Sequence, residues 1–414
     1  MRLVLFTAYY PYDGGEEFII SEMKTAEKMF DEILLVSYVK PPLILDKYVP
    51  ENAKIITVRS NYSKLRTAAR ALSLLLRKSV ISEIRREIKN GESRGKAEII
   101  KSVLASELAI SCYEENQSKW ISDEPSIYCS YWLDGSATYL ARNRDKLGGL
   151  CVSRTHRGDC FDGCDHHAYR KQQLEGLDYI LPISGAGRED LLKQADRFGV
   201  EAEEKIKVFR LGTLDGIIGT NPANISEEKH IVTCSSILPV KRLDLMIDAL
   251  ARIDGINILW THLGGGSSED EIKNLAKNKL SGKPNIRYEF LGQMLNENVL
   301  AYYASSPVDL LVNCSDSEGI PVSVMESMCF GIPAVVRDVG GNCELVDDDT
   351  GILLPRKEDT LKLAEAITEI LTEDDGKKQK RRKAASDKVR SLYSAEKNYR
   401  DFYNFLIMKS GVTE

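Results

Sequence analysis

The sequence lacks any long hydrophobic run, and no window approaches the ~18 consecutive apolar residues expected of a membrane-spanning helix. It also lacks an excess of positive charge, since its formal net charge of −6 argues against nucleic acid as the main partner. No short repeat and no low-complexity tract is present in the 414 residues. The remaining composition, 43% hydrophobic and 29% charged residues, is typical of a soluble globular protein.

A secretory leader is not evident either. The first residues, MRLVLFTAYYPYDGG, lack the length and cleavage pattern of a signal peptide and predict a first β-strand. The nine cysteines are odd in number and scattered along the chain, which indicates reduced thiols. We therefore expect a cytoplasmic protein.

The chain is too long for one typical core, so two domains are expected. A turn-rich run at 212–228, with Gly216, Gly219 and Asn221-Pro222, predicts the hinge between them. Each half opens with a buried strand followed by a loop and a helix. This pattern is typical of parallel α/β domains.

The most informative stretch is Asp309–Val346, which reads as strand, turn, helix, strand and glycine turn. Pro321 suits the first helical position, because its ring fixes φ and its missing N–H would be unpaired there. Gly331 and Pro333 end the helix. Gly340-Gly341 ends the second strand.

Two carboxylates mark this stretch, Glu318 in the turn before the helix and Glu326 eight residues later inside it. At ~1.5 Å rise per residue, they can contact two ends of one elongated ligand but need not share a proton. Between them, Gly319, Ile320 and Pro321 lead into a helix N-terminus, whose free N–H groups suit a phosphate. An ordinary strand-helix-strand crossover with one solvated glutamate is the alternative interpretation.

Glu318-Gly-Ile-Pro-Val-Ser-Val-Met-Glu326 resembles the E-x7-E element of the family-4 glycosyltransferases, which are retaining, nucleotide-sugar-dependent enzymes. The following Met-Cys-Phe-Gly-Ile-Pro segment and the Gly340-Gly341-x-x-Glu344 loop resemble that family as well. The resemblance is best over about 231–355 and thinner over 1–213.

This resemblance implies an α/β fold of two Rossmann-like domains facing a cleft, known as GT-B. The implied acceptor-side domain is 1–212, joined by a C-terminal helix at 394–414 that crosses back to it. The implied nucleotide-sugar-binding domain is 213–393. The resemblance also implies a nucleoside diphosphate sugar as co-substrate, of UDP or GDP type, and no metal or other cofactor.

The resemblance assigns roles to particular residues. Lys241 would neutralise the donor diphosphate, Glu318 would hold the donor sugar, and Glu326 would accept hydrogen bonds from the ribose. Gly265 and Gln293 follow two further predicted strands and are expected on the donor side.

One position departs from the family pattern. Ser236 occupies the place of an arginine that normally accompanies the lysine, and serine brings no charge to a phosphate. Either Arg242 or Arg210 replaces that charge, or donor binding is weak or abolished.

In the first half, Gly14 and Gly15 follow the first predicted strand and are expected to contact the acceptor or the donor phosphate. A tight turn with no ligand is the alternative. His156 follows a later strand, where open α/β sheets present ligand contacts. By resemblance it would lie near the donor sugar or acceptor and count among the catalytic residues; a structural histidine is the alternative.

Residues 59–96 are unusually basic, with eleven Lys or Arg against three Glu. The apolar residues that can share one face of a helix there are Leu72, Leu75, Leu76, Val80, Ile84 and Ile88. Such a helix suits an anionic membrane surface or a lipid-linked pyrophosphate acceptor. A helix that covers the sheet with a solvated basic rim is the alternative.

Cys160, Cys164, His166 and His167 match zinc-ligand spacing only loosely, and no second ligand pair stands at a standard distance. We therefore predict no metal site.

The sequence thus predicts a retaining, metal-independent hexosyltransferase that acts on a glycan or lipid-linked acceptor in polysaccharide or glycolipid biosynthesis, with possible peripheral attachment to the inner membrane face. A catalytically inactive binding or scaffold subunit is the alternative that Ser236 keeps open. A related epimerase or phosphorylase is less favoured, because no lysine–cofactor motif is present.

Overall fold

The computed structural model describes residues 1–12, 16, 18–39, 44–45, 47–58, 64–89, 95–161, 168–212, 220–357 and 359–411, with 64–68 described in backbone only. Contacts divide the chain into two compact units. The first comprises Met1–Leu211 with Glu396–Glu414, and the second comprises Gly212–Ala395.

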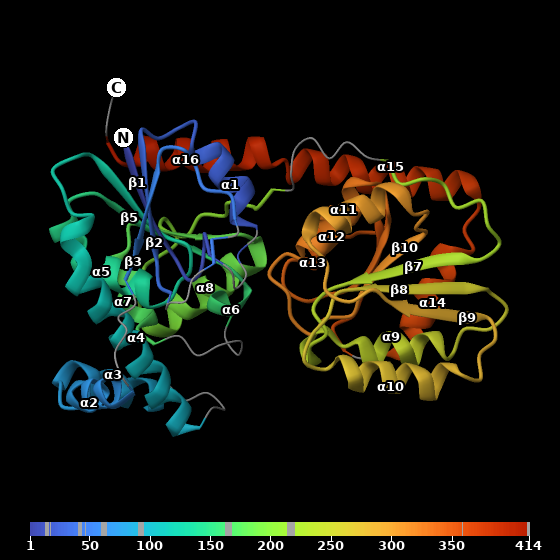
Figure 1. Cartoon of the computed structure of the whole chain (residues 1–414), viewed down its shortest axis with the longest axis horizontal. Helices are drawn as coiled ribbons and strands as arrows, with labels where there is room; N and C mark the ends of the chain where they lie inside the picture. The colour runs from blue at the N-terminus through green and yellow to red at the C-terminus, as the bar shows by residue number, and fades with distance from the viewer. Residues whose placement is uncertain are drawn as a thin grey trace. The chain divides into compact units, whose positions relative to one another are not determined.

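The first unit is built on a parallel six-stranded sheet of order β3-β2-β1-β4-β5-β6 (Figure 1). Its strands are β1 (Arg2–Thr7), β2 (Glu32–Ser37), β3 (Ala53–Thr57), β4 (Ser126–Ser130), β5 (Leu150–Thr155) and β6 (Tyr179–Pro182). Its helices are α1 (Ile19–Ala26), α2 (Lys64–Leu74), α3 (Lys78–Lys89), α4 (Lys96–Asn116), η1 (Gln117–Lys119), α5 (Gly135–Leu147), α6 (Arg157–Cys160), α7 (Arg170–Gly176), α8 (Gly185–Phe198) and α16 (Ala395–Lys409).

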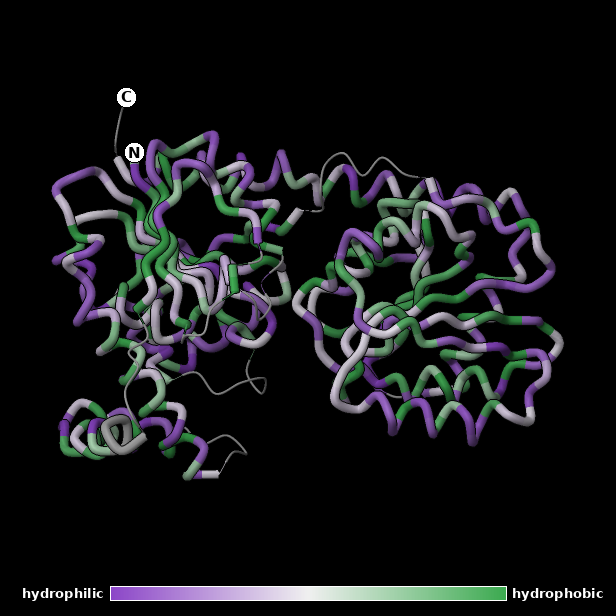
Figure 2. Tube along the Cα trace, in the orientation of Figure 1, coloured by the Kyte–Doolittle hydropathy of each residue, from purple (hydrophilic) through white to green (hydrophobic). Residues whose placement is uncertain are grey.

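Alternate residues of β1 pack into two different hydrophobic cores, one on each face of the sheet. Val4 and Phe6 pack with apolar side chains of α3, α4, α5, α7 and α8. Leu3 and Leu5 pack with those of α1 and α16. The strands are hydrophobic along their length (Figure 2) because helices cover both faces of the sheet.

A buried ion pair ties the terminal helix α16 to this unit. The Arg154 guanidinium and the Glu22 carboxylate are both fully buried and lie 3.1 Å apart. Tyr131 and Tyr403 donate hydroxyl hydrogen bonds of 2.9 and 3.1 Å to the same carboxylate. Because Tyr403 belongs to α16, the last helix is part of the first unit, as the resemblance implied.

The second unit repeats the same topology. Its parallel sheet has the order β12-β11-β10-β7-β8-β9. Its strands are β7 (Lys229–Cys234), β8 (Ile258–Leu263), β9 (Ile286–Phe290), β10 (Leu310–Asn313), β11 (Ala334–Arg337) and β12 (Gly351–Leu354). Its helices are η2 (Pro239–Lys241), α9 (Leu243–Leu250), α10 (Glu269–Leu280), α11 (Asn296–Ser305), α12 (Val322–Cys329), α13 (Asn342–Leu345), α14 (Thr360–Leu371) and α15 (Asp375–Leu392).

Helices cover both faces of this second sheet. Apolar side chains of α9, α10 and α14 form its largest core with alternate strand residues such as Ile231 and Trp260. Helices α11, α12 and α15 lie on the opposite face (Figure 1). The prediction of two parallel α/β domains is confirmed.

The basic stretch departs from its prediction of one amphipathic helix. It contains two helices, α2 and α3, separated by a turn in which Leu76 and Arg77 donate to Ser73 and Leu74. Val80 is fully buried in the first unit's core, whereas Leu72 and Leu76 are 66% and 80% exposed. These residues therefore do not share one apolar face.

Among the helices that the structure describes, none combines the length and the hydropathy needed to cross a bilayer.

We predict that Arg154→Met destabilises the first unit by about 3–5 kcal/mol, because it leaves the buried Glu22 carboxylate without its cation. The matched control is Arg144→Met, whose half-exposed ion pair with Asp178 is worth about 1 kcal/mol or less. Urea unfolding of both variants measures the difference. Equal losses of stability would contradict the central role of the buried pair.

Candidate functional site

The chain order in the second sheet reverses between the adjacent strands β7 and β10. Open parallel sheets bind ligands at the carboxyl ends of the strands beside such a reversal. The loops that follow these two strands are 235–242 and 314–321. A backbone hydrogen bond of 2.9 Å from Asp316 N to Val240 O joins them.

Two predicted catalytic residues meet at this point. Lys241 Nζ lies 2.7 Å from Glu318 Oε1, across 77 positions of sequence. Glu318 is buried, and the Lys241 side chain is 23% exposed. Asn313 Nδ2, at the end of β10, donates to the same carboxylate oxygen at 3.3 Å. The pair thus places one cation and one anion at the carboxyl edge of the sheet.

Three further predicted donor-side residues lie on neighbouring loops of this edge. Ser236 follows β7 and is exposed, Gly265 follows β8 and is buried, and Gln293 follows β9 and is exposed. Ile237 N donates to Gly265 O at 2.9 Å, and Gly264 N donates to Gly292 O at 2.9 Å. Backbone hydrogen bonds therefore connect the three loops to one another.

Arg242, which sequence reasoning offered as a substitute for the missing arginine, is engaged inside the second unit. Its backbone is left-handed, with φ +51°. Its guanidinium lies 2.8 Å from Asp244 and 3.2 Å from Asp316. Two carboxylates therefore offset its charge in this structure.

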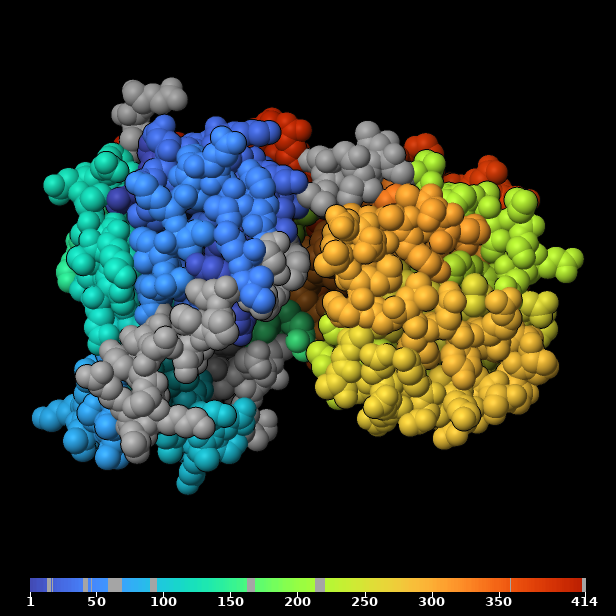
Figure 3. Space-filling view, viewed as in Figure 1, coloured from blue at the N-terminus to red at the C-terminus, as the bar shows by residue number. Residues whose placement is uncertain are grey.

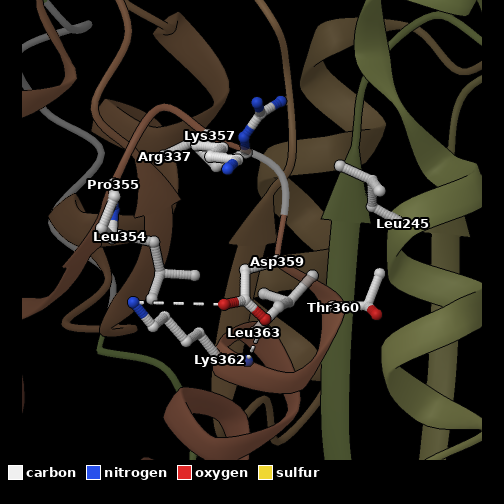
Figure 4. A pocket seen from close by; sticks show the side chains of 9 residues that line it. All are labelled: Leu245, Arg337, Leu354, Pro355, Lys357, Asp359, Thr360, Lys362 and Leu363. Atoms are coloured by element: carbon white, nitrogen blue, oxygen red, sulfur yellow. Dashed lines mark hydrogen bonds and ion pairs between the residues drawn. The ribbon is translucent and has the colours of Figure 1, made fainter.

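Arg337, which sequence reasoning missed, holds the loop that precedes Glu318. It is the last residue of β11, is 5% exposed, and forms an ion pair with Asp316. Its Nη1 also donates to Cys314 O at 2.9 Å and Ser315 O at 3.3 Å. Arg337 also lines a small pocket, together with residues such as Leu354 (Figure 4). The sequence did contain a signal that could have identified Arg337, because an arginine stands at the end of a predicted buried apolar strand.

The entry to α12 differs slightly from its prediction. Pro321 is the N-cap residue rather than the first helical residue, and its carbonyl accepts hydrogen bonds from Val324 N and Met325 N. Its φ of −74° suits both the N-cap and the first helical position. The proline ring therefore fixes the backbone angle at the start of α12 but does not determine which of the two positions Pro321 occupies. Gly319, Ile320 and Pro321 are all buried.

Glu326 lies on the second turn of α12 and is partly buried. Asn296 Nδ2, from the first turn of α11, donates to its Oε1 at 2.7 Å. Burial raises the pKa of Glu326 to about 7, and the hydrogen bond from Asn296 opposes that rise only in part. Glu326 and Glu318 therefore have different surroundings, one paired with an amide and the other with a cation.

The glycine pair after β11 packs directly on the Glu318 loop. Gly340 has φ +56°, and a Cβ placed there would lie 1.7 Å from Glu318 O. Gly341 N donates to Gly319 O at 2.6 Å. Only glycine permits this close approach.

In the first unit, His156 follows β5 and is buried among aromatic rings. Its ring stacks on Tyr131 with centroids 5.0 Å apart and lies 4.6 Å from the Trp132 ring. Burial and the nearby Arg154 charge lower the pKa of His156 well below its usual range, so the ring is neutral. Within the described residues neither ring nitrogen has a hydrogen-bond partner.

The other predicted residues of the first unit, Gly14 and Gly15, lie outside the described residues. The neighbouring Glu16 is described, and its carboxylate accepts hydrogen bonds from Tyr9 N at 2.7 Å and Tyr10 N at 2.5 Å. The Trp132 indole N–H also donates to it. This buried glutamate, which the sequence did not single out, fixes the backbone that follows β1.

No group of three or more potential metal ligands occurs in the part of the chain that the structure describes. Of the loosely zinc-like set, Cys160 is buried in the first unit's core. Cys164, His166 and His167 lie outside the described residues.

We predict that Gly340→Ala lowers the stability of the second unit by about 1–3 kcal/mol, because the added methyl group meets Glu318 O and the left-handed backbone disfavours alanine. Gly282→Ala is the control, since a Cβ there meets no atom within 4 Å. Urea unfolding midpoints compare them. Equal midpoints for the two variants would show that the Glu318 loop tolerates displacement.

Comparisons with known proteins agree with this architecture. Residues 220–389, most of the second unit, match the family model described as glycosyl transferases group 1. Over 276 residues the chain is 26% identical to a D-inositol 3-phosphate glycosyltransferase of Mycobacteroides abscessus, an alignment that covers 59% of this chain and 58% of that protein. The chain therefore spans less than two thirds of that relative's length.

Solved structures resemble the fold over nearly the whole chain. The apo form of the lipopolysaccharide outer core galactosyltransferase WaaB has a TM-score of 0.69 at 16% identity, covering 99% of this chain and 100% of that one. Anabaena Alr3699/HepE in complex with UDP has a TM-score of 0.66 at 16% identity, covering 98% and 99%.

The chain therefore has the GT-B fold, and its second unit carries the match to glycosyl transferases group 1.

Proposed function

We propose that this protein is a retaining glycosyltransferase that moves a sugar from a nucleoside diphosphate to an acceptor hydroxyl. The observation that carries the proposal is the Lys241–Glu318 pair at the strand reversal of the second unit. It lies within the region that matches glycosyl transferases group 1. The proposal includes the family-4 assignment and the E-x7-E roles of Glu318 and Glu326.

The chemistry follows from where charge develops. When the bond between the sugar's anomeric carbon and the phosphate oxygen breaks, negative charge builds on the leaving diphosphate. Lys241 Nζ would lie against that charge, together with the N-terminal N–H groups of α12 beyond Pro321. Neither group needs a metal ion to be positively polarised, so we propose a metal-independent reaction.

Glu318 would orient the donor sugar. Its buried carboxylate has accepting oxygens, and sugar hydroxyls are donors that match it. If Lys241 turns toward the diphosphate, the sugar hydroxyls and Asn313 remain to satisfy Glu318. We assign Glu318 no role as a nucleophile.

Retention would follow from attack on the same face of the sugar that the diphosphate leaves. The acceptor oxygen forms the new bond to the anomeric carbon, and its proton passes to the leaving phosphate oxygen. No covalent sugar–protein intermediate is needed. Glu326, further along α12, would accept hydrogen bonds from the donor ribose.

For the acceptor, we propose a glycan or a lipid-linked glycan, contacted by the first unit. His156 is the candidate there, because its buried neutral ring has two nitrogens without partners among the described residues. Relatives named for lipopolysaccharide and colanic acid synthesis support polysaccharide biosynthesis as the setting. The UDP bound to Alr3699/HepE supports a UDP-type donor.

One observation favours the inactive binding subunit as the second candidate. Ser236 carries no charge, and Arg242 is held by Asp244 and Asp316. Lys241 would then provide the main cationic side chain for the diphosphate in this unit. Donor binding therefore decides between the two candidates.

We predict that a thermal-shift screen with UDP, GDP and ADP identifies one stabilising nucleotide. A ligand at ~100 times its Kd stabilises the native state by ~2.7 kcal/mol. Lys241→Ala should weaken that binding ~10–100-fold, because a charge-assisted hydrogen bond to phosphate is worth about 1.5–3 kcal/mol. Lys277→Ala, on the exposed surface of α10, is the matched control.

A shift with one nucleotide, followed by transfer from its sugar derivative, supports the enzyme. A shift without any transfer or donor hydrolysis favours the binding subunit. If no nucleotide at millimolar concentration shifts the well-folded protein, the Ser236 position has cost the donor site its charge, the enzyme proposal fails, and the inactive subunit becomes the favoured candidate.

We further predict that nucleotide affinity falls as the pH drops from 8 to 6, since Glu326 with a pKa of about 7 becomes protonated. The ionised carboxylate is the stronger acceptor for ribose hydroxyls. In Glu326→Gln, only the titration of the diphosphate itself should remain. Calorimetric Kd values across this range, measured for both proteins, isolate the Glu326 contribution. Coincident pH profiles, or unchanged affinity in Glu326→Ala, would remove the ribose role.

A further inference from the structure

Away from the candidate site, the first unit carries an open pocket lined mainly by cations. Its volume is about 430 Å³. Five of its lining residues are basic, and none is acidic: Arg85, Arg86, Lys89, Lys171 and Arg197. Ser82 adds a hydroxyl group and Phe198 an aromatic ring.

Three helices bring these residues together. Ser82, Arg85, Arg86 and Lys89 belong to α3, whereas Lys171 belongs to α7 and Arg197 to α8. Helix α3 lies at the surface of the first unit, in light blue in Figure 3. Arg85 and Lys89 are four residues apart and therefore lie on one helix face, where like charges repel each other.

The carboxylates nearby do not balance this charge. Arg86 pairs with the buried Glu83, and Lys171 lies 3.6 Å from Glu175. Arg85 and Lys89 are exposed, and no ion pair of theirs occurs among the described residues.

Further interactions of Arg197 and of the neighbouring Glu87 bear on this charge. The guanidinium of Arg197 lies 5.2 Å from the ring of Phe198. Burial and the Glu83 charge raise the pKa of Glu87 to about 7, so this carboxyl carries only part of a negative charge near neutral pH. Cations therefore remain in excess around the pocket.

The pocket is distinct from the predicted ligand-binding edge of the first sheet. Helix α8 starts just after the carboxyl end of β6, and its 14 residues span ~21 Å. After α8, the chain returns beside Ile180 near the start of β6, through the hydrogen bond from Lys207 N to Ile180 O. Arg197 and Phe198 thus lie toward the opposite edge from His156.

We propose that this pocket binds a phosphate-bearing anion, held by Arg85 and Lys89 of α3 together with Lys171 and Arg197. Guanidinium groups match phosphate oxygens in a two-pronged geometry, and lysines add charge. The ligand is either the headgroup of an anionic phospholipid or a soluble phosphorylated compound. The exposed Leu72 and Leu76, just before α3, give the lipid source an apolar contact.

The experiment compares wild type, the double variant Lys89→Ala/Lys171→Ala, and the control Lys119→Ala, an exposed lysine of the first unit outside the pocket. One arm measures co-sedimentation with phosphatidylcholine vesicles with and without phosphatidylglycerol. The other arm measures calorimetric binding of inorganic pyrophosphate, with Lys241→Ala added to every protein to silence the candidate donor site.

The double variant should bind roughly 25-fold more weakly, since each cation near an anionic surface contributes a factor of roughly five. Loss in the vesicle arm identifies a lipid headgroup, and loss in the pyrophosphate arm alone identifies a soluble phosphorylated ligand. If the double variant behaves like the control in both arms, the proposal is overturned. In the double variant that keeps Lys241, nucleotide binding at the second unit should not change, which separates this result from failure of the proposed function.

Discussion

The ion pair between Lys241 and Glu318 is the interaction on which the candidate site depends. A carboxylate as buried as Glu318 loses most of its hydration, and a cation at 2.7 Å offsets that loss. The pair also joins two loops that lie on either side of the strand reversal. It therefore stabilises the arrangement of the site and keeps a cation at the edge of the sheet, where a diphosphate would contact it. A ligand that supplies phosphate to Lys241 and hydroxyl groups to Glu318 would satisfy both residues separately.

The surroundings of this pair restrict its geometry. Arg337 binds the loop backbone before Glu318, and Asp316 in turn bonds to Arg337 and Arg242. Gly340 lies so close behind Glu318 that no side chain fits between them. The result is a loop held from two sides. Such support is the condition under which a catalytic group keeps its position within a fraction of an ångström.

In the first unit, the charged pair beside the sheet stabilises the fold and does not line a candidate site. Its central charges, Arg154 and Glu22, are wholly enclosed and hold α16 in place. Five further cations line the pocket of α3, α7 and α8, where carboxylates do not balance them. Although the net charge of the chain is −6, the surface around this pocket is strongly basic. Charge that serves the fold is buried and paired, whereas the pocket's charge is exposed and in excess.

Much of the fold could be predicted from the sequence, because its signals are local. Apolar runs followed by turns predicted the parallel strands. Pro321 at the helix start and Gly331 at its end predicted the strand-turn-helix frame of the second unit. Local signals were less reliable where packing competes with pattern. Leu72 and Leu76 share the helical spacing of Val80, yet Val80 is buried in the core and the two leucines are exposed.

The sequence by itself determined which residue types stand at the ends of the strands, since strand and helix periodicity depend on near neighbours. Only the tertiary structure decided which of them meet. Lys241 and Glu318 are 77 positions apart, and a parallel sheet brings them together through strand order that no local pattern encodes. The same reason explains why Arg337 was missed and why Arg242, chosen for its charge, is held by two carboxylates. Contacts between distant segments depend on how the sheet is assembled, and that assembly is a property of the whole domain.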